Sequence, residues 1–104
     1  MNLSEIEINH HFGGGVYAKE TIIPAGVAMT QHVHPCHDHL SILASGRACL
    51  SVDGVESVMD APACILIKAG SAHIVTGVTE VRWYCIHATE ETDTSKIDAV
   101  IIHG

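Results

Sequence analysis

The sequence predicts an all-β fold that closes into a sandwich or barrel, and three observations support this class. Turn-forming residues recur every ~8–12 residues, which is the spacing of short antiparallel strands. Short runs rich in β-branched and apolar residues lie between the turns. No segment of helical length keeps a 3.6-residue hydrophobic period. About eight short strands in one open sheet would expose a face and two edges, so we expect closure.

The expected strands follow one another along the chain, each bounded by turn residues. Asp53-Gly54 predicts a two-residue hairpin, because Asp-Gly readily adopts the positive φ angles of such turns. The other turns are Gly13-Gly14-Gly15, Pro24-Ala25-Gly26, Ser45-Gly46, Ala61-Pro62 and Ala69-Gly70. The expected strands are residues 21–23, 40–43, 48–52, 63–67, 81–86 and 97–102. The polar segment 88–96 is expected to be a loop that leads to the last strand.

Length and composition indicate one domain that spans residues 1–104. Hydrophobic residues make up 47% of the chain and charged residues 16%, which is a globular composition. The low charged fraction indicates that a second chain covers some apolar surface, so we expect a homodimer, with segment 97–102 as a candidate for pairing across the interface. The formal net charge of −7 opposes binding to nucleic acid and to anionic membranes.

The N-terminal residues and the cysteines indicate a cytoplasmic location. Residues 1–7 lack the basic and apolar regions of a signal peptide. No apolar run approaches the ~20 residues of a membrane-spanning helix. The four cysteines contain no C-x-x-C spacing and are expected to be free thiols. They are Cys36, Cys49, Cys64 and Cys85.

Histidine is the anomaly of the composition, with nine in the chain and four of them between residues 32 and 39. In a strand, His32 and His34 point to the same face. His39 opens the next apolar run, and His73 follows a turn further along. Clustered imidazoles are typical ligands of transition metals. The alternatives are that these histidines bind no metal, or that His37 replaces His39 as a ligand.

These residues resemble the cupin superfamily. The first cupin motif runs G-x5-H-x-H-x3 or 4-E-x6-G, and its positions fall on Gly26, His32, His34, His39 and Gly46, with histidine in place of glutamate at position 39. The second motif runs G-x5-P-x-G-x2-H-x3-N. Gly70 and His73 match its centre, whereas Pro62, Lys68 and Gly77 occupy positions where Gly, Pro and Asn are usual.

The resemblance implies a cupin-type double-stranded β-helix, a jelly-roll barrel that is often dimeric. Motif 1 then spans residues 26–46 and motif 2 spans residues 62–77. It also implies one divalent metal ion in the barrel mouth, held by His32, His34, His39 and His73. All-nitrogen ligands favour Fe, Ni, Cu or Zn over Mg or Ca.

Several functions are compatible with such a site. The first is a dioxygenase-like metalloenzyme that acts on a small chelating molecule such as an enol, a diketone or a hydroxy acid. A non-redox lyase or isomerase is an alternative within the enzyme class. The second class is a small-molecule binding or sensing protein without catalysis, and a metal-free structural barrel is the third.

Side chains alternate between the two faces of a strand, so those of the expected strand at residues 81–87 divide into two groups. His87 shares a face with Trp83 and Cys85 and is a candidate proton-transfer group, or else a buried hydrogen-bonded histidine. Arg82 and Tyr84 share the opposite face, where a surface or interface role is expected.

Overall fold

The structure is a computed structural model of the chain, and it describes residues 5–30, 38–89 and 91–97. The all-β prediction is confirmed, because the described residues form nine strands. The strands are β1 (Glu7–Gly13), β2 (Val16–Ile23), β3 (Ala28–Thr30), β4 (His39–Ser45), β5 (Arg47–Val52), β6 (Val55–Asp60), β7 (Ala63–Ile67), β8 (His73–Gly77) and β9 (Val81–Ala88). No helix in these described ranges is long and apolar enough to cross a membrane.

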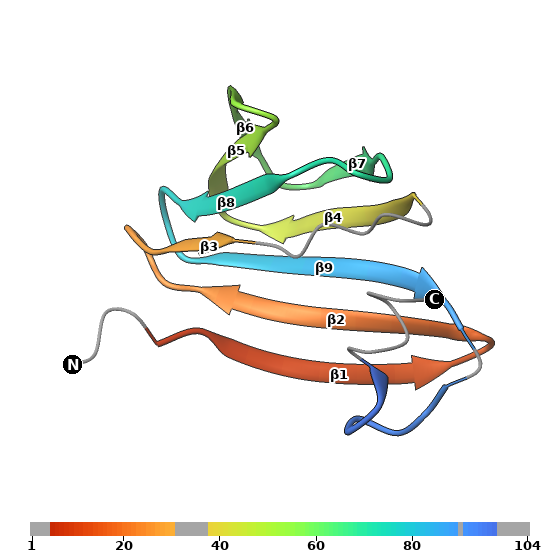
Figure 1. Ribbon diagram of the computed structural model, residues 1–104. Helices are drawn as coiled ribbons and strands as arrows, with labels where there is room; N and C mark the ends of the chain where they lie inside the picture. The colour runs from red at the N-terminus through yellow and green to blue at the C-terminus, as the bar shows by residue number, and fades with distance from the viewer. Residues whose placement is uncertain (1–4, 31–37, 90, 98–104) are drawn as a thin grey trace.

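The strands form two antiparallel sheets. The five-stranded sheet has the order β1-β2-β9-β4-β7, and the four-stranded sheet has the order β3-β8-β5-β6. In Figure 1, β1, β2, β9 and β4 run side by side across the view. From β2 to β9 the chain changes sheet at every connection except the β5–β6 hairpin. This repeated crossing produces the jelly-roll sandwich that the sequence predicted.

The inward face of the five-stranded sheet is apolar at one end and polar at the other. Cross-strand register places Thr21 opposite Trp83 at the apolar end, and Trp83 opposite Leu43. The two-sheet core around them comprises Ile23, Leu43, Ala48, Leu50, Val75, Val81, Trp83 and Cys85. At the polar end, Tyr17 lies opposite His87. The apolar core therefore holds the sheet in place, and the polar side chains gather at the opposite end of its inward face.

Some elements differ from the prediction. The edge strand β1 was not expected, because Glu7–Gly13 is polar and carries two adjacent histidines. The expected strand 21–23 is the end of the longer β2. The predicted last strand lies outside the described residues except for Ile97, where the prediction is wrong. Ile97 lies in a helical turn, with its N–H donating to the Asp93 carbonyl at 3.1 Å, and its side chain is buried against Tyr17 and Phe12.

Two glycines with positive φ differ in their surroundings. Gly46, the last glycine of motif 1, has a φ of +90°, and a Cβ there would overlap the backbone carbonyl oxygen of Glu80. Gly54 in the β5–β6 hairpin has a φ of +83°, but a Cβ there meets nothing within 4 Å. Both positions carry the backbone cost of positive φ, and only Gly46 adds a steric one.

We expect Gly54→Ala to lower the free energy of unfolding by about 1–2 kcal/mol, because a side chain disfavours positive φ. Gly46→Ala is expected to cost a further 1–3 kcal/mol, roughly, because the overlapped atoms belong to backbone and cannot rotate away. Urea unfolding of the two variants measures the difference. Equal losses of unfolding free energy in the two variants would show that the Glu80 carbonyl oxygen can move away from a side chain at position 46.

Candidate metal centre

Three buried histidines converge from three strands of the two sheets. His39 opens β4, His87 lies near the end of β9 and His73 opens β8. Their exposed fractions are 4%, 3% and 1% respectively. The ring centroids of His39 and His73 are 5.9 Å apart, and those of His39 and His87 are 4.7 Å apart. His39 and His73, two of the four residues predicted as metal ligands, therefore lie close together although they come from different sheets.

The His39 and His73 rings are compatible with one metal ion between them. Each imidazole nitrogen binds a transition metal at about 2.0–2.1 Å, so two rings at this separation can share one ion. His32, His34 and the competing ligand His37 lie outside the described residues. Among the residues that are described, no group of three His, Cys, Asp or Glu side chains has a metal-holding arrangement.

Strand alternation directs His39 inward. His39, Ser41 and Leu43 are all buried, whereas the intervening Leu40 is exposed. The preceding Asp38 faces elsewhere, and its carboxylate accepts a hydrogen bond of 2.8 Å from the backbone N–H of Ala69. This bond joins the start of β4 to the turn that precedes His73.

The turn before His73 is held from a second side. The Asp53 carboxylate accepts a hydrogen bond of 2.9 Å from the backbone N–H of Ala72, and the Asp53 N–H donates to the Ala72 carbonyl at 2.9 Å. Asp38 and Asp53 thus fix both ends of segment 69–72. This arrangement positions His73 opposite His39 through the backbone rather than through contacts of the rings.

His87 lies beside His39 in a different geometry. The two rings stack with an interplanar angle of 27°. Stacked imidazoles direct their in-plane nitrogens along similar directions rather than toward a common point between them. His87 is therefore better placed to hold the His39 ring in position, or to act on a bound molecule, than to share a metal ion with it.

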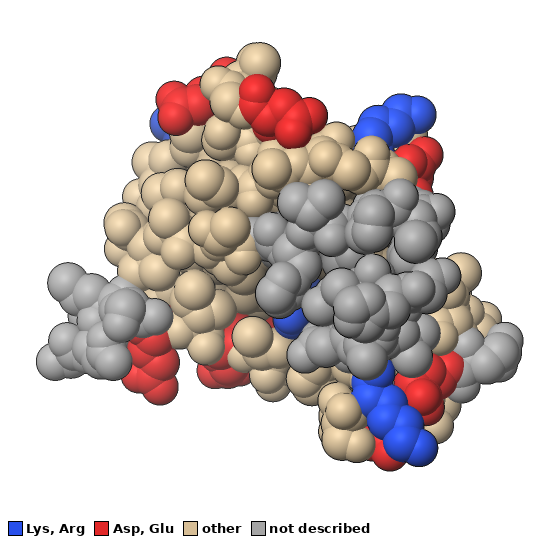
Figure 2. All heavy atoms as spheres, viewed as in Figure 1, with Lys and Arg blue, Asp and Glu red and all other residues tan. Residues whose placement is uncertain are grey.

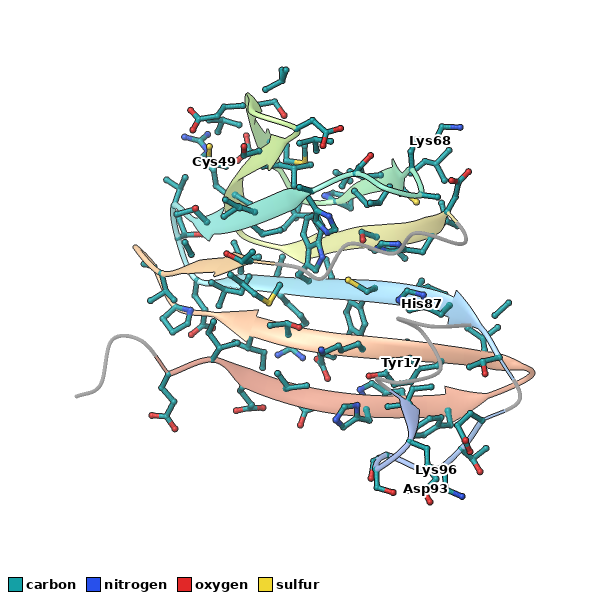
Figure 3. The ribbon with its side chains drawn as sticks, in the orientation of Figure 1. Tyr17, Cys49, Lys68, His87, Asp93 and Lys96 are labelled. Atoms are coloured by element: carbon teal, nitrogen blue, oxygen red, sulfur yellow. The ribbon has the colours of Figure 1, made fainter. Side chains whose placement is uncertain are left out.

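Tyr17 on β2 continues this row of rings toward the edge strand β1. Tyr17 is fully buried, and its ring centroid lies 6.3 Å from that of His87, with an interplanar angle of 21°. Figure 3 shows the two side chains on adjacent strands at the same end of the sheet. The Tyr17 hydroxyl forms a hydrogen bond of 2.6 Å with Nδ1 of His10 on β1. Tyr17 therefore belongs to a small apolar cluster with Ile97 and Phe12, and it also forms a wall of the polar end.

Lys19 lies on the inward face of the sheet, a placement that the sequence analysis did not identify. Register places Lys19 opposite Cys85, on the same inward face as Tyr17 and Thr21. Across the inward-facing positions of the described strands, Lys19 is the one side chain of fixed charge. Lys19 lies two residues from both Tyr17 and Thr21 along β2, and this spacing was the sequence signal for its inward placement. The neighbouring Ser41 hydroxyl lies 3.7 Å from the Cys85 sulfur.

A separate polar cluster lies on the outer face of the same sheet. The Glu20 carboxylate accepts hydrogen bonds from Nε2 of His11 at 2.9 Å and from the Tyr84 hydroxyl at 3.0 Å, and it pairs with Arg82. As predicted, Arg82 and Tyr84 share this face. The His11 hydrogen bond is the main cause that lowers the pKa of Glu20, with contributions from Tyr84 and Arg82, and burial opposes it.

Comparison of the sequence with protein-family models and with curated proteins finds no match. The fold, in contrast, is similar to many solved structures. A cupin 2 domain-containing protein from Halorhodospira halophila is 14% identical, with a TM-score of 0.70 over 95% of this chain and 78% of that chain. The chain therefore has the cupin fold, which the histidine motifs had indicated.

Two further neighbours show the functional range of this fold. A variant of salicylate 1,2-dioxygenase from Pseudoaminobacter salicylatoxidans is 9% identical, with a TM-score of 0.68 over 80% of this chain and 26% of that chain. The Cupin_2 domain of an XRE family transcriptional regulator from Enterobacter cloacae is 11% identical, with a TM-score of 0.68 over 78% of this chain and 93% of that chain. At these identities the likeness establishes the fold alone.

The lowered pKa of Glu20 predicts an acid-dependent loss of stability. A carboxylate with a depressed folded-state pKa stabilises the protein fully above its unfolded pKa, and this contribution disappears as the pH falls through the folded value. We expect Glu20→Gln to have a lower Tm than the wild type at neutral pH and a flatter decline in acid. Thermal unfolding at stepped pH measures this, with the exposed Glu56→Gln as control. If Tm fell by the same amount with decreasing pH in the wild type and in Glu20→Gln, the prediction would be wrong.

Proposed function

We propose that this chain is a metal-binding cupin that acts as a dioxygenase-like enzyme on a small chelating organic anion. The observation that carries this proposal is the pair of buried imidazoles, His39 and His73, which face each other from the two sheets at 5.9 Å between ring centroids. His32 and His34 complete the proposed ligand set. A bound Fe, Ni or Cu ion would supply Lewis acidity and redox chemistry toward O2.

The residues around this pair support a site for a bound molecule. His87 and Tyr17 form one wall, and both are almost fully buried. His87 stands within reach of a molecule bound beside His39, where its ring nitrogens can hold or transfer a proton. Lys19 provides a positive charge on the same inward face. A substrate that carries a carboxylate, such as a hydroxy acid, matches this charge better than a neutral diketone.

The salicylate 1,2-dioxygenase neighbour supports the enzyme class, because a chain of the same fold carries that activity. The regulator domain supports a second candidate, a sensing protein that binds a small molecule without turnover. Coordination distinguishes the two, since an enzyme needs an exchangeable position on the metal. Spectral changes on adding azide to the metal-loaded protein would favour the enzyme.

Metal content is the first test. We expect the purified wild type to hold about one equivalent of Fe, Ni or Cu, and His39→Ala and His73→Ala to bind it at least about tenfold more weakly. The control is His11→Ala, because His11 lies on the outer face with 55% of its side chain exposed. Elemental analysis and competition with a chelator measure the affinities, and circular dichroism confirms that each variant is folded.

The outcomes separate the alternatives. Zinc in place of a redox metal would favour lyase or isomerase chemistry over a dioxygenase. A wild type that takes up no metal, or alanine variants that keep the metal as tightly as His11→Ala does, would overturn the proposed site. With a redox metal bound, oxygen uptake in the presence of enols, diketones and hydroxy acids tests the reaction itself.

A second test concerns the charge of the substrate. We expect Lys19→Met to weaken binding of hydroxy acids to the metal-loaded protein by about tenfold, equivalent to about 1.4 kcal/mol, and to leave neutral diketones nearly unaffected. Lys68→Met is the matched control, because the Lys68 side chain is 69% exposed. Spectroscopic titration with both ligand types measures the change. Equal losses for charged and neutral ligands would assign Lys19 a structural role.

A further inference from the structure

A row of aromatic rings crosses the five-stranded sheet from its edge to the buried histidine pair. Each ring comes from the next strand of the sheet, in the order His10 on β1, Tyr17 on β2, His87 on β9 and His39 on β4. The successive ring centroids are 5.7, 6.3 and 4.7 Å apart. His10 is exposed, whereas His39 is buried. The row therefore connects the surface at β1 with the candidate metal centre.

A hydrogen bond joins the first two rings of this row. The Tyr17 hydroxyl lies 2.6 Å from Nδ1 of His10. In the imidazole tautomer that carries its proton on Nε2, Nδ1 accepts the phenolic O–H. Imidazole is also a base that takes up and releases protons near neutral pH. Because His10 is exposed, a proton that it takes from Tyr17 can pass on to water.

The Tyr17 ring itself is shielded from solvent. It is fully buried, and it packs against Ile97 and against Phe12, whose ring centroid is 5.1 Å away. A phenol that loses an electron becomes a very strong acid, so its oxidation proceeds readily where a base takes the proton at once. Burial keeps bulk water from serving as that base, and His10 is in position to do so. We infer that Tyr17 is a redox-active tyrosine that passes its phenolic proton to Nδ1 of His10 when its ring loses an electron.

The other oxidisable aromatic side chains lack this combination. The chain has two tyrosines and one tryptophan. Tyr84 donates its hydroxyl to Glu20, a weak base because the hydrogen bond from His11 is the main cause that lowers the pKa of its carboxyl group. The buried Nε1 of Trp83 has no hydrogen-bond partner in the part of the chain that the structure describes. Loss of an electron is therefore most favourable at Tyr17.

The role of Tyr17 toward the metal centre rests on the proposed function. Reduction of a hydroperoxide to an alcohol and water breaks its O–O bond and consumes two electrons and two protons. One electron comes from a bound redox metal ion, and the second comes from Tyr17 across the His87 ring. The phenolic O–H bond breaks, an N–H bond forms at Nδ1 of His10, and His10 returns this proton to the solvent that supplies both protons to the peroxide. Tyr17 thereby spares the buried histidines from oxidation.

Voltammetry of the metal-free protein tests the pair without the metal. In Tyr84→Phe, Tyr17 is the remaining tyrosine, and we expect an oxidation peak that disappears when Tyr17→Phe is added. Adding His10→Gln instead is expected to shift this peak to higher potential, because glutamine accepts a hydrogen bond but does not take up the proton. His11→Gln is the matched control, since the adjacent His11 bonds to Glu20 on the other face of β1. Circular dichroism checks that every variant is folded.

Hydrogen peroxide tests the connection to the metal centre. We expect the protein loaded with a redox metal, frozen shortly after peroxide is added, to show a tyrosyl radical by electron paramagnetic resonance. The signal is expected to persist in Tyr84→Phe and to be lost in Tyr17→Phe. Loading with zinc, which supplies no electron, is expected to give no signal.

The two measurements separate this inference from the proposed function. A peak that stays in place in His10→Gln, or that shifts equally in His11→Gln, would overturn the inference with or without metal. A radical that persists in Tyr17→Phe, or a redox-metal-loaded wild type that forms none, would overturn the role of Tyr17 toward the metal. A protein that takes up no redox metal would overturn the proposed function, and voltammetry would then decide the inference by itself.

Discussion

The antiparallel register of β9 between β2 and β4 is the constraint on which the structure depends. This register places Trp83 and His87 on the inward face and Arg82 and Tyr84 on the outward face. A slip of one residue would turn every one of these side chains to the opposite face. The apolar end of β9, packed against Leu43, makes such a slip costly, and the polar end is positioned as a consequence.

Burial of three histidines at the polar end has a free-energy cost. A polar group taken out of water destabilises the fold unless hydrogen bonds or metal coordination compensate it. The chain nevertheless gathers His39, His73 and His87 within a few ångströms, and Asp38 and Asp53 fix the intervening turn through backbone hydrogen bonds. Such an arrangement of costly groups on a rigid frame is typical of a functional site rather than of a core.

The sequence predicted those features that depend on local pattern. Asp53-Gly54 forms the expected hairpin with φ angles of +49° and +83°, and Trp83, Cys85 and His87 share one buried face as alternation predicted. It did not predict β1, Lys19 or the burial of Glu20. Polar residues on an edge strand resemble a loop, and a lone charge in a strand resembles a surface residue. Their environment is set by strands distant in sequence, which no local pattern contains.

Strand β4 contributes to both the histidine pair and the outer face of the five-stranded sheet. His39 and Leu40 are consecutive residues, so one side chain faces His73 on the inside and the next is exposed on the outer face. Ile86 and His87 are related in the same way on β9. The backbone that carries His39 is held from both sides, because β4 pairs with β7 and with β9, the strand that carries His87. The positions of the His39 and His87 rings are therefore set by strand pairing within one sheet, which fixes the side chains on both of its faces at once.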